Sequence, residues 1–413
     1  MDHRRGTAKK PIYGRSFGVL VALLLGAPGA RASQVVTVDQ AVSQAMARPA
    51  LVATLEAERQ EAEAEAVAVG VWPNPEVTYE REQLSETEQV IHVSQEVDLA
   101  GRRGLRADAA RRRADATRLD GEARKRRIGV ETRLAFWAVA HQQARYEVAG
   151  AWLQRLETAE AQTIAREKAG EGSRYDVLRM AREVRRARAD LELTEVNRES
   201  AWLRLQTLTG ALAAPEGWPR VAGEMVPSDL AAMTSDIAVR QDIQAWRARA
   251  EAAGLEASAG RRGWIPRLGL TAGMKRVDGA VTKDSGVTAG VTLSLPLFDR
   301  GQGETARASS AQGRAEATAR WISEDAARLV GPAQERTRRL TALARSLRQE
   351  TEADTRALES TAQAAWLAGE LGLTELLDVQ RDARDDRLAL LDLERAARAA
   401  REQLRRLTLE DSP

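Results

Sequence analysis

The stretch VTAGVTLSLPLFDRGQ, residues 287–302, leads from a strand pattern directly into a helix pattern. Odd positions from Val287 to Leu297 are apolar, and the even positions from Thr288 to Ser294 are Thr, Gly, Thr and Ser. Such alternation is typical of a strand with one apolar and one polar face. After Gly301, helix-favouring residues continue to about Leu367. A strand followed at once by a very long helix is therefore the basic unit of this chain.

The same unit occurs earlier in the chain, where Ile91, Val93, Val97 and Leu99 alternate with polar residues. Other positions repeat as well. Arg48 and Trp72 recur 192 residues later as Arg240 and Trp264, and Leu208 recurs 199 residues later as Leu407. The spacing changes at turns, as expected for two structurally equivalent halves with insertions confined to loops.

Each half is predicted to contain a short helical segment, a strand pair and a long helical hairpin. The first half is expected to have a helix over about 38–69 with Asp39 as N-cap, strands over about 76–84 and 89–99, and a hairpin over about 103–208. The second is expected to have strands over about 267–277 and 286–297 and a hairpin over about 302–407. At about 1.5 Å per residue, the first helix of each hairpin is roughly 100 Å long. The chain is thus predicted to be mainly α with a small β part.

The domain division follows from these elements. It comprises a signal peptide at 1–32, a first repeat at 33–210, a connector at 211–234 and a second repeat at 235–409. Residues 1–32 have a basic start, an apolar stretch from Phe17 to Leu25 and an Ala30-Arg31-Ala32 end, which is the layout of a cleaved secretory signal. A retained anchor is the alternative, but the apolar stretch is shorter than the roughly 20 residues that a spanning helix needs.

Composition excludes several classes of protein. Removing the signal takes away six of the 62 Lys and Arg residues and one of the 60 acids, so the mature chain carries 56 basic and 59 acidic residues. This balance is not that of a nucleic-acid-binding protein. Cysteine is absent, so disulfides and thiolate metal sites are excluded. The 4% aromatic content and 30% charged content favour long paired helices over a globular aromatic core.

The alternating strands allow two interpretations. They suit a transmembrane barrel, in which lipid-facing and lumen-facing positions alternate. They also suit two soluble hairpins that each cover a core. Four strands cannot close a pore alone, so a membrane barrel would require several chains, because every backbone group in lipid needs a partner.

At this point the sequence resembles a known family. The signal peptide, the two repeats and the turn motifs resemble the TolC family of outer-membrane efflux channels over essentially the whole mature chain. Pro73-Asn74-Pro75-Glu76, the segment SQEVDLAGRR at 94–103 and the segment LPLFDRGQG at 295–303 are similar to its heavy-metal branch, of the cobalt-zinc-cadmium resistance type.

The resemblance implies a homotrimer in the outer membrane of a Gram-negative bacterium. Four strands per chain would close a twelve-stranded barrel, and twelve helices would form a long periplasmic tunnel. The chain would be a passive exit duct rather than an enzyme. An inner-membrane pump of the RND type would supply energy, and a periplasmic adaptor (membrane fusion protein) would dock on the helical tips. The implied partners thus include outer-membrane lipid but no nucleic acid, and no cofactor is expected.

Heavy-metal cations are the cargo that the resemblance implies, with drugs, other organic compounds or type I secretion substrates as the alternative. Two other classes of protein compete. A periplasmic adaptor would have a signal and one long hairpin flanked by compact β domains, whereas this chain has two hairpins. A soluble coiled-coil scaffold would need no alternating strands.

The resemblance also implies site residues. The predicted periplasmic gate consists of Asp176, Arg179, Trp366, Glu375 and Asp378. The predicted adaptor-docking tips are Gly170, Glu171, Gly172, Gly369, Glu370 and Gly372. From the alternation alone, the predicted lumen-facing positions are His92, Ser94, Glu96, Thr292 and Ser294. Exposed coiled-coil charges are the competing interpretation of the gate acids, and a solvated strand histidine is that of His92.

No catalytic or metal-binding motif is found. His92 and His141 are remote in sequence, and neither has a second histidine at helical spacing. Gly301-Gln302-Gly303 precedes a helix as phosphate-binding loops do, but here it follows the strand that would leave the barrel. We therefore predict neither a nucleotide site nor a metal site.

Overall fold

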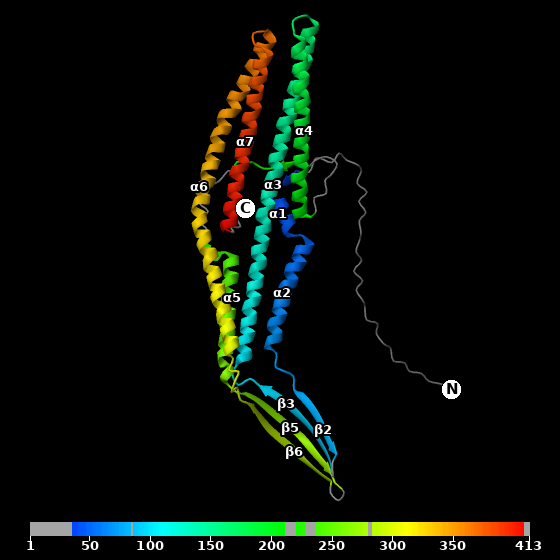
Figure 1. Ribbon diagram of the computed structural model, residues 1–413, viewed down its shortest axis with the longest axis vertical. Coiled ribbons are helices and arrows are strands. Elements are labelled where there is room, and N and C mark those ends of the chain that lie inside the picture. Colours follow the sequence, from blue (N-terminus) through cyan, green and yellow to red (C-terminus); the bar gives the residue numbers. More distant parts are fainter. Residues whose placement is uncertain (1–34, 84–85, 211–219, 228–236, 280–282, 409–413) are drawn as a thin grey trace, which may run out of the picture.

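The computed structural model describes residues 35–83, 86–210, 220–227, 237–279 and 283–408. The molecule is elongated, with a sheet at one end and two helical hairpins that extend to the other (Figure 1). The prediction of a mainly helical chain with two hairpins and four long strands is confirmed. The predicted signal peptide lies outside the described residues, as does most of the predicted connector.

The two hairpins have matching lengths. The helices α3 (Arg102–Lys168) and α4 (Arg174–Thr209) form the first, and α6 (Gln302–Ala368) and α7 (Leu373–Thr408) form the second. Both α3 and α6 start after a glycine with positive φ, Gly101 at 63° and Gly301 at 80°. The left-handed conformation, which favours glycine, turns the chain from strand to helix at the same point in each half.

The predicted helix over 38–69 is wrong as a single element, since the chain forms α1 (Val38–Met46) and α2 (Pro49–Gly70). The break precedes Pro49, whose ring disfavours a helical conformation in Arg48 and which is tolerated at a helix start. The predicted N-cap is also wrong. Thr37 caps α1 in a capping box with Gln40, because its hydroxyl accepts the Gln40 N–H.

Four antiparallel strands form the sheet, in the order β2-β3-β5-β6. They are β2 (Glu76–Gln83), β3 (Thr87–Val97), β5 (Arg267–Asp278) and β6 (Lys283–Ser294). The last strand ends at Ser294, three residues before its predicted end, because Pro296 has no N–H to donate to a neighbouring strand. The strands β2 and β6 are the edges of the sheet.

Short elements fill the middle of the molecule. The strand β1 (Val36–Thr37) pairs in parallel with β4 (Val221–Ala222), which belongs to the described part of the connector. Between η1 (Ile237–Val239) and η2 (Arg262–Trp264) lies α5 (Gln241–Arg261). Met225 and Val226 of the connector are buried, and the Arg398 side chain of α7 donates to the Met225 carbonyl at 3.2 Å. The connector therefore packs against both halves.

The short helices stack end to end beside the long ones: α4 lies above α2, and α7 lies above α5 (Figure 1). A repeated arginine joins each stack. Arg48 donates to the carbonyl oxygens of Thr207 at 2.9 Å and Leu208 at 3.4 Å, at the end of α4. Arg240 donates to the carbonyl oxygen of Leu407 at 2.7 Å, near the end of α7. These bonds satisfy carbonyl groups that a helix end leaves without partners.

The second junction contains an ion pair that the first lacks. Arg240 also holds Asp242 with two bonds, Nε to Oδ1 at 3.1 Å and a terminal nitrogen to Oδ2 at 2.8 Å. Asp242 is buried, and the position that corresponds to it in the first half, 192 residues earlier, is Ala50. Burial by itself raises the pKa of Asp242, but the bonds from Arg240 outweigh it and hold that pKa below its usual value.

None of the helices in the described residues is long and apolar enough to span a membrane.

Candidate functional site

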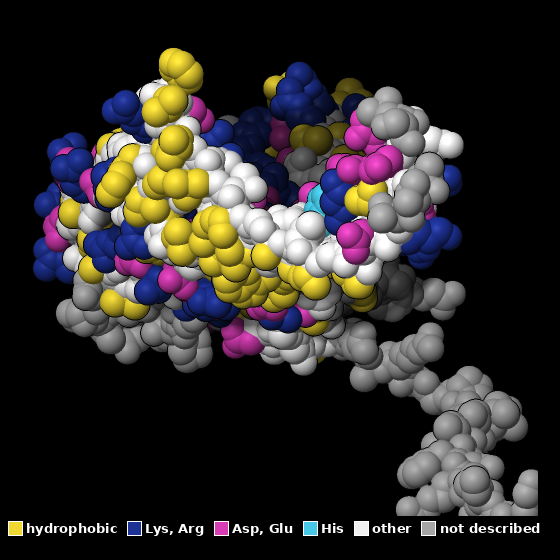
Figure 2. Space-filling view, turned by 90° about the horizontal axis from the view of Figure 1, so that it is seen from below, with side chains coloured by type: hydrophobic (Ala, Val, Ile, Leu, Met, Phe, Trp, Pro, Cys, Tyr) yellow, Lys and Arg dark blue, Asp and Glu magenta, His cyan; other side chains and the backbone are white. Residues whose placement is uncertain are grey.

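The register of the sheet gives it two chemically different faces. Tyr79, Ile91, Met274 and Val287 are side by side in one row across the four strands. All four are exposed, between 48% and 83%. The other members of this apolar face include Val77, Val93, Leu268, Leu270, Val291 and Leu293. Hydrophobic side chains gather in one continuous area at the sheet end of the molecule (Figure 2). A sheet that merely covered a soluble core would bury this face.

The opposite, polar face collects all five strand positions predicted to face a lumen. His92 pairs with Gly273 and Ser94 with Thr271, while Glu96 and Thr292 flank Gly269 in one row. Ser294 is opposite Arg267 at the end of the same face. A methyl group added at Gly273 would approach the His92 Cβ to 2.7 Å, so the histidine occupies the space beside that glycine.

The polar face is also acidic, a property that is not among the predictions made from the sequence. The acidic side chains on it are Glu76, Glu80, Glu82, Glu88, Glu96 and Asp284. Its basic side chains are Arg267 and Lys275, and each lies close to an acid: Lys275 is 2.6 Å from Glu88, and Arg267 is 3.9 Å from Glu96. The signal was present in β2, where Glu76, Glu80 and Glu82 share one parity.

The helical tips form the other end of the molecule. The predicted docking positions Gly170, Glu171, Gly172, Gly369, Glu370 and Gly372 are all exposed. In both turns a backbone N–H folds back onto the preceding helix, from Glu171 to the Arg166 carbonyl at 2.8 Å and from Glu370 to the Ala365 carbonyl at 2.9 Å. The two tips are thus built alike.

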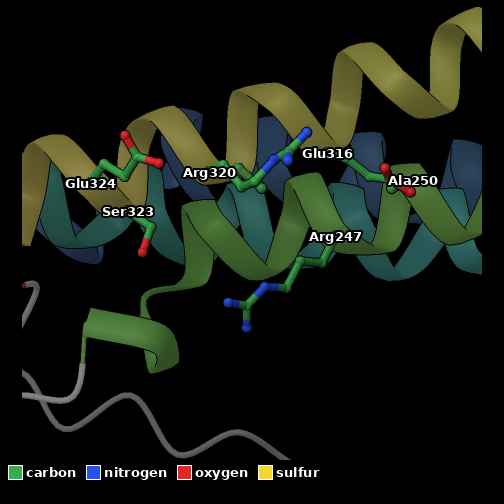
Figure 3. A pocket seen from close by; sticks show the side chains of 7 residues that line it. Arg247, Ala250, Glu316, Arg320, Ser323 and Glu324 are labelled. Carbon is green, nitrogen blue, oxygen red and sulfur yellow. The ribbon is translucent and has the colours of Figure 1, made fainter.

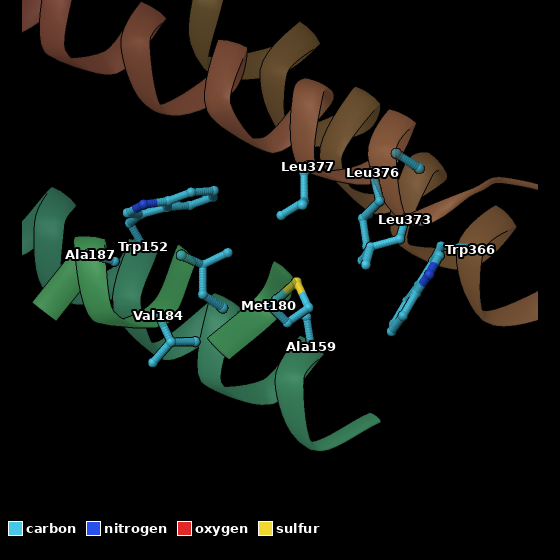
Figure 4. Close-up of a cluster of buried hydrophobic side chains, with 11 residues drawn as sticks. Trp152, Ala159, Met180, Val184, Ala187, Trp366, Leu373, Leu376 and Leu377 are labelled. Atoms are coloured by element: carbon cyan, nitrogen blue, oxygen red, sulfur yellow. The ribbon is translucent and has the colours of Figure 1, made fainter. Parts of the chain in front are cut away.

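Trp366 lies between the hairpins rather than at the surface, with 3% of its area exposed. It belongs to a buried cluster with Met180 of α4 and Leu373 and Leu376 of α7, whose side chains approach one another (Figure 4). Arg166 of α3 donates to the Trp366 carbonyl at 3.0 Å, and its guanidinium carbon lies over the indole ring of Trp366, 5.7 Å from the ring centroid. The tryptophan therefore fixes the two tips against each other.

The predicted gate acids lie on the surface near the tips. Glu375 and Asp176 are in the first turns of α7 and α4, where a carboxylate also stabilises the helix dipole. Asp378 is exposed and pairs with Arg381 at 3.2 Å. Arg179, which the repeat alignment places opposite Asp378, instead donates to the Thr374 hydroxyl at 2.7 Å.

Arg381 is not among the residues predicted from the sequence. Its guanidinium lies 3.0 Å from Glu183 of α4 as well as 3.2 Å from Asp378 of its own helix. With Arg179 and Thr374, it forms a polar connection between α4 and α7. The spacing of Asp378 and Arg381 indicates an ion pair, but nothing in the sequence identifies Glu183 as the partner on the other hairpin.

A partly buried ionic contact lies farther along the hairpins. Glu359 of α6 binds Arg387 of α7 at 2.6 Å and Arg155 of α3 at 3.1 Å. Burial alone would raise the pKa of Glu359. The hydrogen bond from Arg387 and the charge of Arg155 outweigh burial, so the pKa lies below its usual value and the carboxylate is ionised. This contact holds the second hairpin against α3.

The two described histidines lie far apart. His92 is in the sheet, whereas His141 is buried in α3 with its Nε2 2.8 Å from Asp392 of α7. Burial lowers the pKa of His141 despite the hydrogen bond to Asp392. Within the described ranges, no three His, Asp or Glu side chains are arranged to hold a metal ion.

An open groove runs between α5 and α6, lined by Arg247, Ala250, Glu316, Ala319, Arg320, Ser323 and Glu324. Arg247 and Arg320 point in different directions rather than toward a common centre (Figure 3). Its basic and acidic side chains are mixed, so the groove does not favour one class of ligand, and we assign it no function.

Comparison with known proteins finds a curated relative. The chain is 27% identical over 297 residues to the nickel-cobalt-cadmium resistance protein NccC of Alcaligenes xylosoxydans xylosoxydans. That alignment covers 68% of this chain and 65% of NccC, so the chain spans slightly less than two thirds of this curated relative.

Solved structures share the fold. A membrane protein from Pseudomonas aeruginosa superposes with a TM-score of 0.75 at 22% identity, over 91% of this chain and 93% of that one. CusC, described in connection with folding and transmembrane channel formation, superposes with a TM-score of 0.73 at 18% identity, over 90% and 91%. The description "Outer membrane efflux protein" belongs to the family whose sequence pattern matches residues 39–211 and 235–408. Since these two matches cover most of both halves, the chain belongs to the outer membrane efflux protein family.

Proposed function

We propose that this chain is the outer-membrane channel of a tripartite efflux pump and acts as a passive exit duct. The sheet carries this proposal: its apolar face is exposed, and its edge strands β2 and β6 have no partner within the described chain. In lipid, unpaired backbone groups cost several kcal/mol each, so a spanning sheet must close. A homotrimer that joins β6 of one copy to β2 of the next would give a closed barrel of twelve strands.

The helices would form the second part of the duct. Three copies of two hairpins make a ring of twelve helices below the barrel, with the tips at the periplasmic end. There the exposed tip residues from Gly170 to Gly172 and from Gly369 to Gly372 would bind a periplasmic adaptor (membrane fusion protein). Energy would come from an inner-membrane pump, most simply of the RND type, and we expect no catalytic step in this chain.

The two halves, 33–210 and 235–409, would act as equivalent repeats around this tunnel, linked by 211–234. The matching junctions at Arg48 and Arg240 support the equivalence.

For the cargo, we propose heavy-metal cations. The name of NccC associates that relative with nickel, cobalt and cadmium resistance. The acidic polar face adds a physical reason, because acidic side chains around a pore concentrate cations and disfavour anions. Organic compounds or type I secretion substrates remain the alternative cargo, and zone-of-inhibition assays of a deletion strain with metal salts and with drugs would separate the two.

The channel proposal is tested by fractionation and topology. We expect the protein in the outer membrane as a heat-sensitive trimer, and recovery as a soluble monomer would refute the proposal. Thr87 and Lys283 lie at the sheet end opposite the long helices, which would be the extracellular side. In intact cells, Thr87→Cys and Lys283→Cys should therefore react with an impermeant thiol reagent. Labelling only after rupture of the outer membrane would reverse the orientation.

The gate proposal is tested on ion selectivity. Three copies of Glu375 and Asp378 would place six carboxylates near the tips, so Glu375→Ala/Asp378→Ala should weaken the cation preference and the block by divalent cations in planar bilayers. Stability should change little, because surface ion pairs contribute about 0–1 kcal/mol. Asp385→Ala/Asp386→Ala is a matched control, since it removes the same charge from exposed positions on α7. If both trimers show the same selectivity, Glu375 and Asp378 are ordinary surface charges.

A further inference from the structure

One row of side chains on the apolar face of the sheet carries positive charge. Arg81, Gln89, Arg276 and Ser285 are register partners across the four strands. They have the same parity as the apolar face and lie two residues beyond the row of Tyr79, Ile91, Met274 and Val287. Arg81 and Arg276 are both exposed. Two arginines thus project from the apolar face at the point where its apolar side chains end.

Charge is segregated between the two faces at this end of the sheet. On the apolar side, the last two rows carry Arg81, Arg276 and Lys283 against one acid, Asp278. On the polar side, the matching rows carry Glu80, Glu82, Glu88 and Asp284 against Lys275. The acids of these rows are thus collected on the polar face, and the net positive charge lies on the apolar face.

Both arginines also have N–H groups that remain available to a ligand. Arg276 donates to Asp278 through Nε at 3.2 Å, so this bond does not use its two terminal nitrogens. Arg81 makes no ion pair with any of the residues that the structure describes, and no shared acid lies between it and Arg276, since Gln89 separates them in the row. Both guanidinium groups can therefore donate hydrogen bonds to an anion.

The position of the row along the strands indicates where it would lie relative to lipid. From Val287 to Leu293 the apolar side chains of β6 extend over six residues, roughly 16 Å in height at about 3.4 Å per residue and a strand tilt of about 40°. The exposed Leu295, Leu297 and Phe298 continue the apolar surface beyond the end of the strand, toward the band of about 25 Å that outer-membrane barrels have. Exposed aromatic residues mark both borders: Trp72, Trp264 and Phe298 near the helices, and Tyr79 beside the arginine row. The arginine row would then lie at the headgroups of the outer leaflet.

We propose that Arg81 and Arg276 bind phosphate groups of outer-leaflet lipid and so hold the outer surface of the barrel to the surrounding headgroups. This inference rests on the proposed membrane channel. Because β2 and β5 alternate with β3 and β6, a trimer would carry an arginine on every second strand, about 10 Å apart. Arginine suits this role, since its planar fork binds phosphate in a bidentate manner and is always charged.

The experiment compares lipids that differ only in phosphate. The purified trimer is titrated in detergent with bisphosphorylated lipid A, with its dephosphorylated form and with inorganic phosphate, and binding is followed by native mass spectrometry. We expect preferential binding of the bisphosphorylated lipid. In Arg81→Gln/Arg276→Gln this preference should fall by about tenfold or more. The matched control is Arg267→Gln/Lys275→Gln, which removes two charges from the opposite face and should retain the preference.

Three results would overturn the inference. Equal binding of the two lipids by the wild-type trimer would mean that apolar contacts suffice, and this result needs no variant. An unchanged preference in the double variant would place the phosphate site elsewhere. Competition by inorganic phosphate at equal concentration would indicate a free-anion site. Conductance is recorded on the same preparations, so a conducting trimer without lipid preference counts only against this inference, whereas a preparation that does not conduct counts against the channel.

Discussion

Leu293→Arg is expected to abolish recovery of the trimer, whereas Thr292→Arg, one residue away, should leave it intact. Leu293 belongs to the apolar face of β6 and is 52% exposed in the single chain, with Leu268 as its partner. An arginine on the lipid face of a barrel costs up to about 2–4 kcal/mol, the cost being largest at the midplane. The trimer incurs this cost three times, up to about 6–12 kcal/mol in total, which is comparable to the 5–15 kcal/mol of net stability typical of a folded protein.

Thr292→Arg is a better control for Leu293→Arg than Ser294→Arg is, because of the side chains around Thr292. It lies on the polar face in one row with Gly269 and Glu96, so an arginine there meets space, water and an acid. Ser294→Arg should also assemble, with a small penalty from the directly opposite Arg267. Trimer content is measured by unheated gel electrophoresis of outer-membrane fractions. Equal yields of Leu293→Arg and Thr292→Arg would contradict the assignment of the two faces.

The sheet could be predicted from sequence because its signal is local. Alternation in Val287 to Ser294 assigns every side chain to a face, and the register then brings these faces together across the four strands. The same parity places Arg81 with Val77 and Tyr79, so the basic row was also accessible from the sequence. It does not stand out in the sequence because β2 is largely charged, so that its arginine and its apolar positions do not form a clear alternation.

Helix breaks were harder to predict because two signals compete. The apolar and alanine-rich pattern continues across Arg48, and it outweighed Pro49 in the prediction of one helix. In the structure the proline decides, and Arg48 is free to reach the end of α4. Pro332, in contrast, lies inside α6 without ending it. A single proline therefore does not decide a boundary without its tertiary contacts.

The contacts between the hairpins could not be predicted. The repeat alignment places Arg179 and Asp378 at equivalent positions, but equivalence in a repeat does not mean contact in space. Which side chains meet depends on how α4 and α7 are rotated about their own axes, and that rotation is set by the buried cluster around Met180, Trp366 and Leu376. Arg179 consequently reaches Thr374, and Asp378 pairs within its own helix. The role of these residues as a gate stays a prediction.

Arg240→Ala is expected to destabilise the protein far more than Arg48→Ala, although the two arginines occupy equivalent positions. Arg48→Ala removes bonds to two carbonyl groups at a helix end, which is worth about 1 kcal/mol. Arg240→Ala removes the bond to Leu407 and also leaves Asp242 buried, with the Ile243 N–H at 3.0 Å and Arg127 at 3.5 Å as its remaining partners. Breaking a buried pair in this way costs about 3–5 kcal/mol.

A third variant separates the buried charge from the lost helix cap. Arg240→Ala/Asp242→Ala removes the buried carboxylate together with the arginine, which leaves alanine at 242 as Ala50 stands in the first half, and should recover most of the stability lost in Arg240→Ala. The readout is the thermal dissociation temperature of the detergent-solubilised trimer. Because the pKa of Asp242 is lowered on folding, its stabilising contribution is present at neutral pH and is lost as the pH falls through the folded pKa. The advantage of wild type over the double variant should therefore shrink on acidification. Equal effects of Arg48→Ala and Arg240→Ala would show that the junctions depend only on the capped carbonyl groups, and that the buried pair adds nothing to the second one.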